Sequence, residues 1–145
     1  MNKTSRLVLY VEDDLDHAEL VRRSLARHTH GGSILHIEDG EAALDYLGRI
    51  DADTVDRPGL ILLDLRLPKV DGLEVLRTVK QNPRLSDIPV VVLTTSASDS
   101  DLQRAYAQNA NSYLVKPEDF PALDELMKTL GSYWLYWNAL PAVEN

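Results

Sequence analysis

The sequence predicts a single α/β domain in which a parallel sheet lies between two layers of helices. Short apolar segments alternate with amphipathic segments along the chain, which is the pattern of repeated strand and helix units. Three of the apolar segments are nearly continuous in Leu, Ile and Val, as expected for parallel strands covered on both faces. A length of 145 residues suits one domain with a full hydrophobic core.

Five strands are expected, each as a short apolar run. In chain order they are residues 7–11, 34–37, 60–63, 90–93 and 113–115. Helical spacing of apolar residues follows each strand. The positions that carry it are Ala18, Val21 and Leu25; Ala43, Leu44 and Leu47; Leu76 and Val79; Leu102, Ala105 and Tyr106; and Leu123, Leu126, Met127, Leu130, Trp134 and Trp137. The second helix is expected to end at Gly48, before a polar loop over residues 50–59.

Two of these helices have a start signal in the sequence. Asp16 and Glu19 have the spacing of a capping box in the first helix, and Asp71 and Glu74 repeat that spacing in the third. We therefore expect the first helix to begin at Asp16 and the third to begin at Asp71.

Composition excludes several classes of function. Lys and Arg number 15 against 23 Asp and Glu, and the resulting net charge of −8 argues against a nucleic-acid partner. No apolar run approaches a membrane span or a signal peptide, so we expect no membrane association and a cytoplasmic location. Without cysteine there is no disulfide, thiolate zinc site or Cys nucleophile.

Polar side chains follow four of the five predicted strands where each strand ends. They are Glu12, Asp13 and Asp14 after the first strand, Asp64 after the third, Thr94 and Thr95 after the fourth, and Lys116 after the fifth. Because ligands of open α/β sheets bind beyond the carboxyl ends of the strands, we expect these side chains to meet at one edge. Asp14 by itself is equally well explained as a helix cap.

The residue types in this set favour phosphoryl chemistry. Carboxylates a few ångströms apart repel one another, which raises a pKa or recruits a cation. Oxygen ligands without His or Cys favour a hard ion, Mg²⁺ rather than zinc. An Asp beside Mg²⁺, a lysine and a threonine hydroxyl can attack a phosphoryl group and form an aspartyl phosphate, whose three phosphoryl oxygens then each have a partner.

Four sequence blocks resemble the receiver domain of two-component response regulators. They are VEDD at residues 11–14, LLDLRLPKVDG at 62–72, VLTT at 92–95 and LVKP at 114–117. The resemblance covers about residues 6–130 in the family's order and spacing, and it implies a flavodoxin-like (βα)5 fold with strand order 2-1-3-4-5. Residues 1–145 would then form one receiver domain, with a C-terminal aromatic helix extension over about residues 131–145.

The resemblance also implies a phosphoacceptor and a metal site. Asp64 would accept the phosphoryl group from a phosphohistidine on a sensor histidine kinase. The chain would then be a signalling protein rather than an enzyme, apart from slow self-phosphorylation and autodephosphorylation. Asp13 and Asp64 would bind Mg²⁺ directly, with Mn²⁺ or Ca²⁺ as substitutes. Arg66 would contribute its backbone carbonyl, and Glu12 would act through water.

Four further residues gain a role by the same resemblance. Lys116 and Thr94 would hold phosphoryl oxygens, and Tyr113 matches the switch position whose ring turns inward when Thr94 moves. Thr95 stands where many receivers have Ala or Gly, so its bulk is expected to narrow access to the phosphoacceptor. The bond before Pro117 is usually cis in the family.

Softer features resemble the small single-domain regulators paired with bacterial phytochromes. They are LTTS at residues 93–96, ANSY at 110–113 and YWLYW at 133–137. They imply a phytochrome-type kinase as partner. The chain would be a receiver without an output domain, so that its output is dimerisation or the binding of a partner.

Aromatic residues are concentrated at the end of the last predicted helix. Tyr133, Trp134, Tyr136 and Trp137 are four of the nine aromatic residues, and with Leu135 and Leu140 they surround the helix. A surface helix needs only one apolar stripe, so the excess favours an interface. We therefore expect a homodimer through this segment and the adjoining face of the fourth helix and fifth strand.

Two alternative functions are less well supported. A haloacid-dehalogenase-like phosphatase also uses Asp, Thr, Lys and Mg²⁺, but it needs a second Asp two residues after the nucleophile, where this chain has Arg66. A receiver-like interaction module that is never phosphorylated would not need Asp13, Asp64, Thr94 and Lys116 together.

Overall fold

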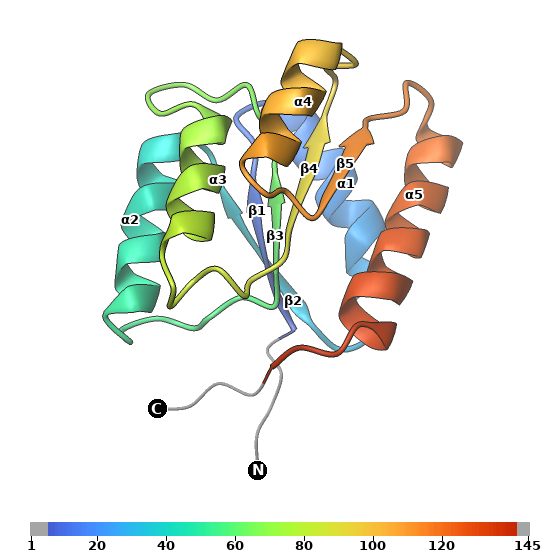
Figure 1. The fold of residues 1–145 in the computed structure, drawn as a ribbon. Coiled ribbons are helices and arrows are strands. Elements are labelled where there is room, and N and C mark those ends of the chain that lie inside the picture. Colours follow the sequence, from blue (N-terminus) through green and yellow to red (C-terminus); the bar gives the residue numbers. More distant parts are fainter. Residues whose placement is uncertain (1–5, 142–145) are drawn as a thin grey trace.

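The computed structural model describes residues 6–141 and confirms the predicted α/β architecture (Figure 1). The strands are β1 (Leu7–Val11), β2 (Ser33–Ile37), β3 (Leu60–Leu63), β4 (Val90–Thr94) and β5 (Ser112–Val115). The helices are α1 (Leu15–Ala26), α2 (Gly40–Asp51), α3 (Gly72–Gln81), α4 (Asp99–Ala107), α5 (Phe120–Ser132) and a π-helical turn, η1 (Tyr133–Trp137). All strand pairs are parallel, and the order is β2-β1-β3-β4-β5, as the family resemblance implied.

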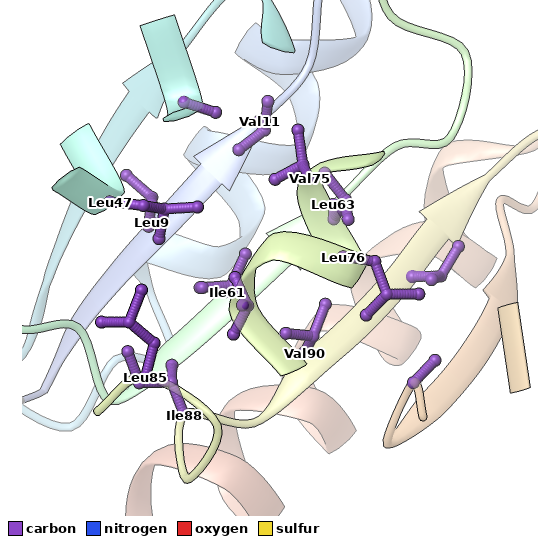
Figure 2. Packing of buried hydrophobic residues seen from close by; sticks show 14 of the residues in the cluster. Leu9, Val11, Leu47, Ile61, Leu63, Val75, Leu76, Leu85, Ile88 and Val90 are labelled. Carbon is purple, nitrogen blue, oxygen red and sulfur yellow. The ribbon is translucent and has the colours of Figure 1, made fainter. Parts of the chain in front are cut away.

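Two layers of helices enclose the sheet, and each contributes its own hydrophobic cluster. The cluster on one face comes from α2, α3 and α4, and the cluster on the other comes from α1 and α5 (Figure 1). In the first cluster Leu47 lies beside Leu9 of β1, and Leu76 of α3 faces the central strands (Figure 2). Each such fully buried side chain contributes about 1.5–3 kcal/mol through apolar burial, which holds the sheet rigid beneath its carboxyl edge.

The N-cap of the first helix lies two residues earlier than the sequence suggested. Asp14, not Asp16, is the N-cap of α1, because its Oδ1 accepts the backbone N–H groups of Asp16 and His17 at 3.0 and 3.1 Å. The predicted capping box at Asp16 is therefore wrong. Glu19 forms exposed ion pairs with arginines of its own helix instead. The cap interpretation of Asp14 is confirmed.

Two other helix boundaries differ from their predictions, and a third is confirmed without its predicted capping bond. The second helix continues past Gly48 to Asp51, so the expected loop begins later. Asp71 is the N-cap of α3 by position, but its side chain makes no capping hydrogen bond. The regular α-helix of α5 ends at Ser132, and the aromatic residues continue as a π-helical turn. Within residues 6–141, no helix has the length and apolar content to cross a membrane.

Candidate functional site

The carboxyl ends of four strands meet at one edge, as predicted, because backbone hydrogen bonds continue the strand ladders past the strand ends. The donors and acceptors are Glu12 N–H to Ile37 C=O at 3.0 Å, Asp64 N–H to Val11 C=O at 3.0 Å and Lys116 N–H to Thr94 C=O at 2.8 Å. The main chain therefore fixes the positions from which the acidic and basic side chains extend.

Glu12, Asp13 and Asp64 form the acidic cluster of this edge. Each offers a carboxylate oxygen, and these oxygens lie within 4.8 Å of one another. Glu12 and Asp64 are buried, whereas Asp13 is exposed, so the cluster opens to solvent on one side. Three carboxylates at this spacing carry more negative charge than the neighbouring lysine offsets, and the all-oxygen donor set fits a hard divalent cation.

Glu12 is the most buried of the three acidic residues. Burial is the main cause that raises the pKa of Glu12 to about 7, and the nearby charge of Asp64 raises it further against the opposing effect of Lys116. One oxygen accepts from the Tyr10 hydroxyl at 3.4 Å, and the other accepts the backbone N–H of Asp14 at 3.1 Å. Glu12 therefore exchanges a proton near neutral pH.

Lys116 is the buried cation opposite the cluster, as its place after the last strand predicted. Its ammonium nitrogen donates to Glu12 Oε1 and lies 3.4 Å from Asp64 Oδ2. It also lies 3.2 Å from Nδ1 of His17 on α1. No cis peptide bond occurs within residues 6–141, so the cis bond that the resemblance implied before Pro117 is not found here.

The phosphoacceptor candidate Asp64 has one further donor. The backbone N–H of Arg66 donates to Asp64 Oδ1 at 3.2 Å, so the loop after β3 folds back over the carboxylate. Gly72, at the start of α3, holds this loop: a Cβ there would lie 2.3 Å from the Asp64 carbonyl oxygen. The Arg66 side chain points elsewhere, to the carboxylate of Asp101 on α4.

Thr94 and Tyr113 are connected through Ser96. The Thr94 side chain is buried, and its hydroxyl oxygen accepts the Ser96 N–H at 3.3 Å. The half-buried Tyr113 donates its hydroxyl to the Ser96 carbonyl oxygen at 2.9 Å. Thr95 is exposed next to them. A movement of Thr94 would therefore reach Tyr113 through one residue.

Sequence reasoning missed four residues of this edge: Tyr10, His17, Ser96 and Asp101. Tyr10 had a signal, because strand alternation places it on the same side as Glu12. Asp101 also had a signal, but it pointed to a helix cap, since Ser98 stands three residues earlier. The contact of His17 with Lys116 had none, because 99 residues separate the two.

The aromatic segment is only partly covered in the monomer. Tyr133, Tyr136 and Trp137 are 54%, 57% and 72% exposed, whereas Trp134 is half-buried and Leu135 is buried. The domain itself covers only one side of this segment. Three large rings remain in contact with solvent.

Comparison with known proteins gives one family. Residues 8–128 match the model of the response regulator receiver domain. The probable methanogenesis regulatory protein FilR2 of Methanothrix harundinacea is 50% identical over 135 residues, which are 93% of this chain and 87% of FilR2. The response regulator Rcp1 of Synechocystis is 41% identical over 138 residues, 94% of each chain.

Two solved structures are similar over nearly their whole length. The Mn²⁺-bound form of Rcp1 aligns with a TM-score of 0.86 over 94% of this chain and 99% of that chain. The phosphorylated cyanobacterial phytochrome response regulator RcpA is 36% identical, with a TM-score of 0.88 over 95% and 99% of the two chains.

Proposed function

This chain belongs to the response regulator receiver domain family, and we propose that Asp64 is the residue that accepts the phosphoryl group. Family membership confirms the sequence-based prediction of a two-component signalling protein with a kinase partner, rather than an enzyme. The observation that carries the assignment is the place of Asp64: a buried carboxylate, within 4.8 Å of two other carboxylates and 3.4 Å from a buried ammonium group.

The proposed transfer is a displacement at phosphorus. An Asp64 carboxylate oxygen attacks the phosphohistidine of the kinase, the new P–O bond forms and the P–N bond breaks. The electron pair of the broken bond returns to the kinase imidazole. Lys116 already faces Asp64 and can move from the carboxylate to a phosphoryl oxygen over a short distance. Its positive charge stabilises the negative charge that gathers there.

We assign Mg²⁺ to the acidic cluster, with Mn²⁺ or Ca²⁺ as substitutes. Receiver domains bind a divalent metal, and the similar protein Rcp1 has a Mn²⁺-bound structure. Asp13 and Asp64 would bind the ion directly, the Arg66 carbonyl would provide a third oxygen and Glu12 would act through water. When bound, the metal supplies positive charge that offsets the carboxylates and the phosphoryl oxygens.

Thr94 and Tyr113 form the proposed switch. The Thr94 hydroxyl would leave the N–H of Ser96 and donate to a phosphoryl oxygen, and Tyr113 would turn inward as Ser96 moves. Thr95, exposed at the same edge, would restrict the approach of the phosphodonor to Asp64.

The proposed phosphodonor reaches Asp64 beside a groove of about 890 Å³ between α1 and the start of α5. Lys116 lines this groove together with the exposed apolar side chains of Leu20, Val115 and Phe120. Such an apolar rim next to a buried reactive carboxylate suits the docking of a protein. By similarity to Rcp1 and RcpA, we propose that this protein is a phytochrome-type sensor histidine kinase.

The exposed aromatic rings support a homodimer as the output of the receiver. Tyr133, Tyr136 and Trp137 from two copies would form the aromatic core of a two-fold interface. The half-buried Trp134 would contribute the exposed part of its ring to that interface. Light scattering on the wild type and on the double variant Tyr133→Ala, Trp137→Ala tests this, and a monomeric wild type at tens of micromolar, about the scale of ordinary dimer affinities, would contradict it.

We propose that residues 1–145 act as one receiver domain in the cytoplasm, with a core of about residues 6–130 and the aromatic segment as its extension. The kinase assignment is tested by phosphotransfer from purified candidate histidine kinases, including a phytochrome-type kinase and an unrelated one. The expected result is rapid transfer from the phytochrome-type kinase to the wild type and none to Asp64→Asn. Equal transfer to both proteins would overturn the assignment of Asp64.

A further inference from the structure

Asp101 lies in the first turn of α4 and carries a carboxylate that is almost fully buried, at 2% exposed. Its Oδ2 accepts from the Ser96 hydroxyl at 2.6 Å and from the Arg66 guanidinium. Its Oδ1 accepts from Arg104 at 2.8 Å. The Ser96 hydroxyl and the two guanidinium groups lower the pKa of Asp101, so the carboxylate is ionised. The Asp101 carboxylate therefore connects the loop after β3, the loop after β4 and helix α4.

Arg66 connects this anion to the phosphoacceptor. Its backbone N–H donates to Asp64 Oδ1 at 3.2 Å, two residues along the chain, while its guanidinium reaches across to Asp101. The Arg66 side chain is 64% exposed, so no packed neighbour prevents it from turning. It can therefore face either the carboxylate of Asp101 or a group attached to Asp64.

Release of Arg66 would not leave Asp101 without a counter-charge. Breaking a buried ion pair is costly when the remaining charge is uncompensated. Here Arg104 stays on Oδ1 and the Ser96 hydroxyl stays on Oδ2. Phosphorylated Asp64 carries about two negative charges where the free carboxylate carries one, so it competes strongly for Arg66 with a carboxylate that keeps two other partners.

We propose that Asp101 is a positioning residue that holds the Arg66 guanidinium away from unphosphorylated Asp64. When Asp64 is phosphorylated, the guanidinium leaves Asp101 and binds the phosphoryl group. The proposal rests on Asp64 being the phosphoacceptor. Loss of Arg66 leaves Asp101 bound to Ser96 alone on that oxygen. Ser96 also forms hydrogen bonds with Thr94 and Tyr113, so the transfer of Arg66 would change the contacts of the proposed switch.

The transfer of Arg66 from Asp101 to the phosphoryl group can be tested with beryllofluoride, an anionic phosphoryl mimic that binds an aspartate oxygen. The protein is titrated with beryllofluoride in the presence of Mg²⁺. Asp101→Asn keeps the shape of the side chain and removes the competing charge, so it should bind the mimic about tenfold more tightly than the wild type. The gain should vanish in an Arg66→Ala background. Arg104→Gln should act in the opposite direction, because Asp101 then retains Arg66 more strongly.

Arginine side-chain NMR reports the exchange directly. In the wild type the Nε–H resonance of Arg66 should shift when the mimic binds, while that of Arg104 should stay in place. Arg22→Gln serves as the control for Arg104→Gln, because it removes an arginine with the same i,i+3 carboxylate pairing on α1. That variant should bind the mimic like the wild type.

Three outcomes would overturn the inference while Asp64 remains the phosphoacceptor. They are equal affinity of Asp101→Asn and the wild type, a gain that persists without Arg66, and an Arg66 resonance that does not respond. If Asp101→Asn does not fold, the affinity of Arg104→Gln for the mimic and the Arg66 Nε–H resonance of the wild type still test the inference. Failure of the wild type to bind the mimic any better than Asp64→Asn would overturn the proposed function itself.

Discussion

The ammonium nitrogen of Lys116 lies 3.4 Å from Oδ2 of Asp64 and also donates a hydrogen bond to Glu12, so one buried cation faces two buried carboxylates. Lys116 therefore has two electrostatic roles. Without a phosphoryl group it lowers the repulsion between the carboxylates, and with one it can neutralise a phosphoryl oxygen.

Lys116→Met should show how each role depends on the charge, because methionine fills similar space without a charge. Divalent metal should bind as tightly as in the wild type or more tightly, since a competing cation is lost. The cost should fall on phosphorylation or on the response of Tyr113. Metal titration and intact-mass analysis measure the two effects, with exposed Lys128→Met on α5 as control. Loss of metal binding in the Lys116 variant alone would contradict this assignment.

Glu12 should make stability without metal depend on pH. Its pKa is raised from 4.5 to about 7 by burial, so the folded protein binds more protons than the unfolded chain between these pH values. Unfolding free energy should therefore fall as pH rises through that window, by at most about 1.4 kcal/mol per pH unit from this group. Urea unfolding in a chelator compares the wild type with Glu12→Gln. Parallel profiles for the two proteins would contradict the shift.

Asp13 and Asp14 should differ sharply in metal binding. Asp13 belongs to the acidic cluster, whereas the Asp14 side chain caps α1. Asp13→Asn should weaken Mg²⁺ binding strongly. Asp14→Asn should leave it nearly unchanged, because Asn is also a good helix cap. Isothermal titration of both variants decides, and equal losses would show that the ligand assignment is shifted by one residue.

Gly72 should be sensitive to a single added methyl group. A Cβ at this position would lie 2.3 Å from the Asp64 carbonyl oxygen, so the loop that holds the phosphoacceptor must move. Gly72→Ala should destabilise the fold by roughly 1–3 kcal/mol and reduce phosphorylation.

Gly48→Ala is the matched control for Gly72→Ala. It adds the same methyl group within α2, where nothing lies within 4 Å, and should stabilise the fold by about 0.5–1 kcal/mol. Chemical unfolding measures both variants. A Gly72 variant as stable and as active as the wild type would contradict the close approach.

The strands and the site edge could be predicted from sequence because local patterns determine both. Apolar runs such as Leu60–Leu63 identify buried strands, and in a parallel sheet whatever follows each strand must gather at one edge. Glu12, Asp64 and Lys116 lie where this argument expected them.

Helix starts and the contacts of Asp101 could not be predicted in the same way. Capping-box spacing fits Asp16, which Glu19 follows three residues later, and not Asp14, which His17 follows at that distance. Only the path of the backbone selects Asp14 as the N-cap. The local pattern at Asp101 indicates a cap with Ser98, but its carboxylate also binds Arg66, which lies 35 residues away in sequence. Such long-range polar contacts depend on tertiary placement, for which a single sequence carries no periodic signal.

Phosphoryl acceptance by Asp64 at this edge can be measured by intact-mass spectrometry after incubation with acetyl phosphate and Mg²⁺. We expect a mass increase of one phosphoryl group on the wild type, lost when the metal is chelated and absent from Asp64→Asn, which keeps the size of the side chain without its nucleophile. An equal adduct on Asp64→Asn, or none on a folded wild type with Mg²⁺ bound, would contradict it.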